Sequence, residues 1–97
     1  MPLVLVIIPS PIDVCDAYDI RVDTARYPRY DRRRISGIID SLAARHGIRR
    51  IDLWMPFRAS KPCDLYYRGG DLHWKANGQA MAARMLSDSL TVWKLAR

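Results

Sequence analysis

One stretch near the start of the chain limits what it can fold into. Residues 3–8, LVLVII, are continuously apolar and rich in β-branched side chains, and a Pro-Ser-Pro sequence at 9–11 stops the run. Apolar residues at every position, rather than at alternate ones, are typical of a strand buried on both faces, as central parallel strands are. We therefore predict a buried parallel strand at 3–8 and an α/β fold.

Residues 9–30 show no period and are expected to be irregular. From Asp31 to Gly47 the pattern is that of an amphipathic helix, because apolar residues recur at three- and four-residue spacing and so form a stripe that faces the core. Asp31 is a suitable N-cap, and Gly47 is a suitable residue just past the C-terminus. The stripe consists of Ile35, Ile38, Ile39, Leu42 and Ala43.

The rest of the chain predicts one more strand and one more helix. Ile51 and Leu53 alternate with polar residues, which indicates a strand. Residues 55–70 are rich in Pro, Gly and basic residues and are expected to form a loop. Asn77 is a suitable N-cap for a second helix. The residues that recur at helical spacing after it are Met81, Ala82, Met85, Leu86, Ser89 and Trp93.

The predicted order is strand, helix, strand, helix, which is a βαβ unit with a parallel pair and one further helix. Sheets usually have about five or six strands, and a second strand covers only one edge of the first. The other edge of the 3–8 strand is therefore expected to be exposed and adhesive. The chain reads either as part of a larger sheet or as a module that pairs with a second copy or a partner chain through this edge.

The charge of the chain does not favour nucleic acid as a partner. The net charge is +6, from thirteen Arg, three Lys and no Glu. The basic clusters, Arg32–Arg34 and Arg49–Arg50, lack the interleaved aromatic residues that a single-strand binder needs. A solvated, arginine-rich surface explains the same composition.

Cysteine content and hydropathy exclude other classes. Cys15 and Cys63 show no metal-ligand spacing and make no disulfide framework, and a bridge between them is not favoured. No apolar run approaches the roughly 20 residues of a membrane span. The first eight residues lack the basic region of a signal peptide, so nothing in the chain indicates a compartment.

Asp71, Leu72 and His73 are the residues with the clearest chemical potential. A histidine relays protons near neutral pH, and a carboxylate on one ring nitrogen orients it for that role. Gly69 and Gly70 permit the tight backbone path that such a pair needs. The segment follows the second strand and precedes the second helix, at the edge where α/β sheets form their sites. The alternative is a surface-loop histidine beside a turn-forming aspartate.

The sequence of residues 65–86, LYYRGGDLHWKANGQAMAARML, resembles the last conserved block of the SGNH (GDSL-type) hydrolase superfamily. The matching residues are Asp71, His73, Trp74, Gly78, Ala82 and Ala83. The resemblance implies that residues 1–97 are the C-terminal part of a single domain, a βαβα fragment of a flavodoxin-like three-layer α/β/α sandwich. It also implies His73 as general base, Asp71 as its orienting acid, an ester or O-acylated carbohydrate as substrate, and no metal or organic cofactor.

The chain departs from that family in what it lacks. Lys75 and Gln79 stand where the family often has Asn and His, and no Gly-Asp-Ser block is present to supply the nucleophile. Ser10 is the only serine expected near the site, and Trp74 and Tyr67 are the expected substrate-binding side chains. We therefore expect the acid–base half of an esterase or O-acyltransferase site, inactive alone. The alternative is a non-catalytic α/β module that pairs through its sheet edge.

Overall fold

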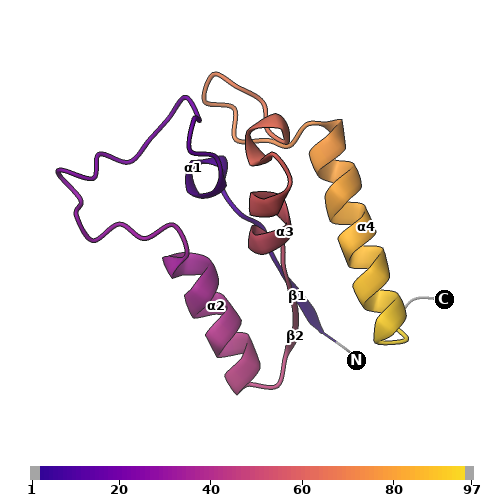
Figure 1. Ribbon diagram of the computed structural model, residues 1–97. Coiled ribbons are helices and arrows are strands. Elements are labelled where there is room, and N and C mark those ends of the chain that lie inside the picture. The colour runs from indigo at the N-terminus through magenta and orange to yellow at the C-terminus, as the bar shows by residue number, and fades with distance from the viewer. Residues whose placement is uncertain (1–2, 96–97) are drawn as a thin grey trace.

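The computed structural model describes residues 3–95 and has a small α/β fold (Figure 1). The two strands are parallel neighbours, and the predicted order of strand, helix, strand and helix is present. Two short helices and a 3-10 turn add to it. In chain order the elements are β1 (Val4–Ile7), α1 (Pro11–Val14), α2 (Arg34–Arg45), β2 (Arg49–Asp52), α3 (Trp54–Ala59), the 3-10 helix η1 (Pro62–Asp64) and α4 (Ala76–Val92).

The parallel pair brings the carboxyl ends of both strands to one edge of the sheet. Val4 lies opposite Arg49 and Ile7 opposite Asp52. The Leu53 amide donates to the Ile7 carbonyl at 3.1 Å and continues the pairing past β2. In Figure 1, α2 and α4 lie on either side of the strands, and the loop before α4 passes over the same end of the sheet as α1.

Helix α2 forms where predicted, but of its apolar stripe only Ala43 is buried. Ile35 is 69% exposed and Leu42 is 46% exposed, whereas Ser36 and Ala43 are the buried residues. Two strands about 4.8 Å apart are narrower than a helix about 10 Å across. The stripe therefore extends past β1, and only the small residues meet the strands.

The ends of α2 are also settled by local contacts. Its N-cap is Arg33, so the prediction of Asp31 as N-cap was wrong. The Asp31 carboxylate accepts a hydrogen bond from the Arg33 amide at 2.9 Å, in the turn before the helix. Gly47 has φ +65° just past the C-terminus, as predicted. A left-handed conformation of this kind favours glycine because it has no Cβ.

Strand β1 differs from the prediction of burial on both faces. Val6 and Ile8 are exposed, and Ile7 is the buried residue of the strand. The expected free edge is present, because β2 is the only strand paired with β1 in residues 3–95. Within the described residues the continuous apolar run is therefore only partly covered.

The core lies at the carboxyl end of the sheet, under residues that were predicted to be loop. Residues 55–70 contain α3 and η1, and Trp54 and Phe57 are buried one helical turn apart. The helix α3 was predicted to be loop because it has a proline at its third position, although proline is tolerated in the first turn of a helix. The buried core cluster consists of Val14, Cys15, Tyr18, Ile51, Leu53, Trp54, Phe57, Leu65, Tyr66 and Ala82.

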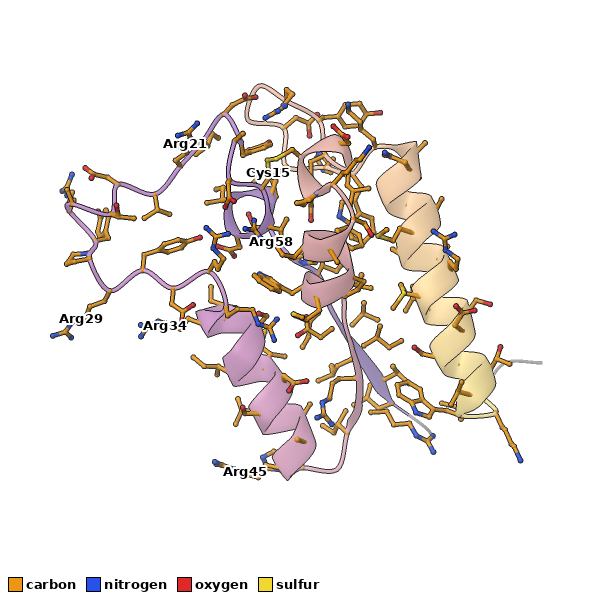
Figure 2. All side chains as sticks on the ribbon, in the orientation of Figure 1. Cys15, Arg21, Arg29, Arg34, Arg45 and Arg58 are labelled. Atoms are coloured by element: carbon orange, nitrogen blue, oxygen red, sulfur yellow. A yellow bond between two sulfur atoms is a disulfide. The ribbon has the colours of Figure 1, made fainter. Side chains whose placement is uncertain are left out.

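Cys15 and Cys63 form a disulfide, contrary to the sequence-based interpretation (Figure 2). Their Cα atoms are 4.9 Å apart although 48 positions separate them in the sequence. Helix α1 and η1 pack against each other and bring the two side chains together. The bridge ties the segment after α1 to the segment that leads into the Asp71–His73 loop.

Helix α4 covers the core with the predicted face. Ala82 is buried, and the larger residues of the stripe pack partly buried against the core cluster. The helix begins at Ala76 with Lys75 as N-cap, so the prediction of Asn77 as N-cap was wrong. Asn77 instead donates to the Asp64 carbonyl at 3.0 Å. Within residues 3–95, no helix has both the length and the apolar character needed to cross a membrane.

Candidate active site

The loop between η1 and α4 is a narrow hairpin that presents Asp71 and His73. The Tyr67 amide donates to the His73 carbonyl at 3.1 Å, and the Lys75 amide donates to the Leu65 carbonyl at 2.8 Å. These bonds hold the returning arm of the loop against the outgoing arm. At the tip, Gly69 and Gly70 have φ angles of +75° and +82°. Residues with a Cβ atom rarely adopt such angles.

Asp71 holds His73 through one oxygen atom. Asp71 Oδ1 accepts from the His73 backbone amide at 3.0 Å and lies 2.6 Å from Nδ1 of the imidazole ring. The hydrogen bond from the His73 backbone amide, and after it the hydrogen bond with the ring, lower the pKa of the Asp71 carboxyl group. Because an ionised carboxylate only accepts hydrogen bonds, the proton of the neutral ring is on Nδ1.

This arrangement leaves His73 able to exchange a proton on its outer side. Nε2 has no hydrogen-bond partner within residues 3–95, and the side chain is 88% exposed. A ring with Nδ1–H directed at a carboxylate has its basic lone pair on Nε2. The pair can therefore accept a proton from a hydroxyl group that approaches Nε2, with Asp71 stabilising the charged ring.

His73 borders a shallow hollow of about 250 Å³ at the end of β1. The Trp74 indole forms part of the wall and is fixed from behind by Phe57, with ring centroids 5.4 Å apart. The residues that line the hollow are Ile8, Pro9, Leu72, His73, Trp74 and Gln79. None of these side chains has a hydroxyl or thiol group, so the hollow presents the histidine of the acid–base pair without a nucleophile.

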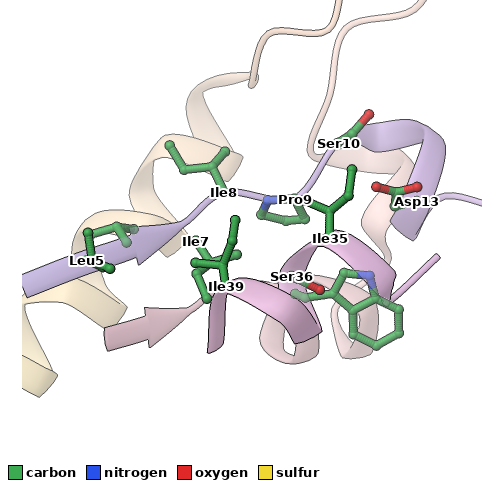
Figure 3. Close-up of a pocket in the computed structure, with 11 residues that line it drawn as sticks. Leu5, Ile7, Ile8, Pro9, Ser10, Asp13, Ile35, Ser36 and Ile39 are labelled. Atoms are coloured by element: carbon green, nitrogen blue, oxygen red, sulfur yellow. The ribbon is translucent and has the colours of Figure 1, made fainter. Parts of the chain in front are cut away.

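Ser10 does not join this group. Its hydroxyl accepts from the Ile12 amide at 3.2 Å and caps α1. It lines a different hollow, of about 400 Å³, that runs between β1 and α2 (Figure 3). A serine two residues before a helix amide is well placed for capping, and that role explains its position.

Tyr67 contributes its backbone rather than its ring. Its amide donates to the His73 carbonyl, and its own carbonyl accepts from the Tyr18 hydroxyl at 3.1 Å. The ring is half exposed and is not among the lining residues of the His73 hollow. Of the three side chains predicted to bind substrate, the structure places only Trp74 beside His73.

Two buried tyrosines donate hydrogen bonds to backbone carbonyls near the site, and neither contact was predicted from the sequence. The Tyr18 hydroxyl donates to the carbonyls of Tyr67 and Asp71, at 3.1 and 2.9 Å. The Tyr66 hydroxyl donates to the Pro9 carbonyl at 2.6 Å, and burial raises the pKa of Tyr66 to about 12. Tyr18 lies in a segment without periodicity, so no local pattern marked it.

The chain was compared with known proteins in three ways. No protein-family model, curated protein or solved structure matches this chain. Within residues 3–95, no cluster of His, Cys, Asp or Glu residues is suited to a metal ion. The geometry around Asp71 and His73 is therefore the basis for a functional proposal.

Proposed function

We propose that Asp71 and His73 are the acid–base half of a serine ester hydrolase or O-acyltransferase of the SGNH type. The observation that supports this most directly is the 2.6 Å contact between Asp71 Oδ1 and His73 Nδ1, on a ring whose other nitrogen is open to solvent. The two strands, α2 and α4 would then be the closing part of a flavodoxin-like sandwich. The 97 residues would form the C-terminal part of that domain.

The proposed reaction needs a serine from another polypeptide segment. His73 Nε2 would take the proton of the serine hydroxyl as its oxygen attacks the acyl carbonyl carbon of the ester. The imidazolium, stabilised by Asp71, would then return the proton to the departing alcohol. Water or a second alcohol would release the acyl group in the same way, with His73 again as base. The donors that stabilise the oxyanion would come from the added segment.

The substrate would lie beside the Trp74 ring. The hollow is shallow and mostly apolar, with His73 and Gln79 as its polar lining residues. A flat indole beside polar side chains suits a sugar ring or a short acyl group. An O-acylated carbohydrate, the substrate class implied by the family resemblance, fits this chemistry.

The coding sequence upstream of Met1 provides the first test, because the proposal requires an in-frame Gly-Asp-Ser block there. The chain extended by that segment should then hydrolyse a short-chain p-nitrophenyl ester. Asp71→Asn should reduce kcat by about 10³–10⁴-fold, by analogy with triads whose acid is neutralised. Asp88→Asn, an exposed change on α4, is the matched control. An upstream region without such a block, or full activity in His73→Ala, contradicts the proposal.

A second function is favoured by a different observation, the uncovered apolar surface along β1 and α2. We call it the β1–α2 face; it consists of Leu3, Val6, Ile8, Ile35, Ile38, Ile39 and Leu42, each at least 37% exposed. Figure 3 shows side chains from both elements around the hollow between them. Monomers rarely expose contiguous apolar patches beyond about 300–600 Å², and seven large aliphatic residues are exposed along these two elements.

In this second function the chain is an interaction module whose partner is a second copy. Two β1 edges can pair antiparallel about a two-fold axis, which makes the surface self-complementary. The pairing would satisfy the unpaired backbone groups of β1 and cover the aliphatic residues of α2. The dimer would occupy the edge at which a serine-bearing segment would dock.

A further inference from the structure

The tip of the Asp71–His73 loop is held by one short segment, residues 15–20. The Gly69 amide donates to the Asp19 carboxylate, and Arg68 Nη1 donates to the Ala17 carbonyl at 2.8 Å. A Cβ atom on Gly70 would lie 3.2 Å from the end of the Ile20 side chain, so Gly70 packs closely against that side chain. Each residue of the tip therefore meets the same segment.

Tyr18 is the buried member of this segment, with a side chain only 1% exposed. Its hydroxyl lies 3.1 Å from the Tyr67 carbonyl and 2.9 Å from the Asp71 carbonyl. One carbonyl precedes the Gly-Gly turn and the other follows it. One hydroxyl hydrogen shared between two acceptors therefore closes the base of the turn.

The segment itself is firmly anchored. Cys15 is joined to Cys63, and the Tyr18 amide donates to the Cys15 carbonyl at 3.3 Å. Arg58 Nη1 donates to the Val14 carbonyl at 2.7 Å and its Nη2 pairs with the Asp16 carboxylate at 2.9 Å. Figure 2 shows Cys15 and Arg58 beside α1. The Tyr18 hydroxyl is thus presented from a fixed base.

We propose that Tyr18 is the positioning residue of the Asp71–His73 pair. Asp71 can reach both the amide and the ring of His73 only while its own backbone is held in the observed conformation, and the Tyr18 hydroxyl bonds that backbone directly. The contacts of Arg68 and Gly69 with residues 17 and 19 hold the exposed tip, whereas the buried Tyr18 hydroxyl bonds the Asp71 backbone itself. That this positioning serves catalysis rests on the proposed hydrolase function, whereas the positioning itself does not depend on it.

The test is Tyr18→Phe, followed by nuclear magnetic resonance on the 97-residue chain. In the wild type, the neutral His73 ring should show its proton on Nδ1, and the Asp71 carboxyl should titrate at a lowered pKa. In the variant, the Nδ1 proton should be shared with Nε2, and the Asp71 pKa should return toward its ordinary value. His46, the only other histidine, lies at the end of α2 and is the internal reference.

Tyr66→Phe is the matched control. Tyr66 is as buried as Tyr18, and its hydroxyl also donates to a backbone carbonyl, that of Pro9. The substitution removes this hydroxyl. It should lower stability to a similar extent and leave the Asp71 and His73 signals at their wild-type positions. A folded Tyr18→Phe variant with wild-type signals overturns the proposal, as does a Tyr66→Phe variant with the same change.

A pair of isosteric replacements keeps the test decisive if Tyr18→Phe does not fold. 4-Methylphenylalanine at position 18 fills the space of tyrosine without a donor, and 4-aminophenylalanine keeps one. The amino variant should retain the wild-type His73 signal, and the methyl variant should lose it; equal signals in both contradict the role of the hydroxyl. These signals need no serine and no ester, so a failure of the hydrolase proposal would appear separately, as absent activity with the Tyr18 effect intact.

Discussion

Asp71 and His73 are joined twice through a single oxygen atom, because Asp71 Oδ1 binds both the backbone amide and the ring Nδ1 of His73. The first bond sets the distance between the two residues and the second sets the rotation of the ring. In residues 3–95 no third side chain bonds the Asp71 carboxylate or the His73 ring. The Tyr18 hydroxyl bonds the backbone carbonyl of Asp71 instead.

The 97-residue chain should not hydrolyse a short-chain p-nitrophenyl ester above the buffer rate. The hollow beside His73 has no hydroxyl or thiol in its lining, so the base has nothing to activate. A release assay at 405 nm on wild type and His73→Ala checks this. Turnover that disappears in His73→Ala would point to a serine supplied within the chain or by a second copy.

The β1–α2 face should cause self-association that a charge on the strand edge prevents. Val6→Lys places an ammonium group on the unpaired edge of β1, where it opposes edge-to-edge pairing. Sedimentation velocity should show dimers in the wild type and monomers in this variant. Val92→Lys, at an exposed position on α4, should remain dimeric. A wild type that stays monomeric at high concentration argues against the second copy.

Loss of the Cys15–Cys63 bridge should lower stability by about 3–4 kcal/mol, the amount expected for a loop of this length. The two cysteines are 48 positions apart, so the reduced unfolded chain gains considerable freedom. Urea unfolding of the chain with and without a dithiol reductant measures the difference. The double variant Cys15→Ser/Cys63→Ser should match the reduced protein and should not respond to the reductant.

Acid should weaken the attachment of the segment after α1. Hydrogen bonds from Arg58 and Arg32 lower the pKa of Asp16 from 3.8 to about 2. A folded-state pKa below the unfolded one stabilises the fold above the unfolded value, and this contribution is lost as pH falls from about 4 to about 2. Thermal melts should show this loss in the wild type and a flatter profile in Asp16→Asn. An unchanged profile would mean that the ion pair is too exposed to matter.

Two glycines in helices should respond to alanine with opposite signs. A Cβ on Gly78 would lie 2.7 Å from the Leu65 carbonyl oxygen, whereas a Cβ on Gly37 would meet nothing within 4 Å. Gly78→Ala should therefore destabilise the fold by about 1–3 kcal/mol through overpacking. Gly37→Ala should stabilise it by about 0.5–1 kcal/mol through helix propensity. Urea midpoints distinguish the two, and a loss in both would contradict the open space at Gly37.

The parts of the fold that could be predicted were those set by neighbouring residues. Hydrophobic spacing located β1, α2, β2 and α4, and their order predicted that the two strands are parallel. The contact between Asp71 and His73 was predicted from their two-residue spacing together with the family resemblance of residues 65–86, because the spacing alone also allowed a surface-loop histidine. The helix α3 was missed since its pattern is only one turn long and contains a proline.

Contacts between distant residues were decided by the tertiary structure. The Cys15–Cys63 bridge and the hydroxyl of Tyr18 on the Asp71 carbonyl each join residues about fifty positions apart. No local spacing predicts such pairs, because they depend on how α1, η1 and the loop pack together. The same holds for the α2 stripe, which the sequence marks as apolar but which a two-stranded sheet is too narrow to cover. The sequence determines which groups are apolar or reactive; packing decides which of them meet.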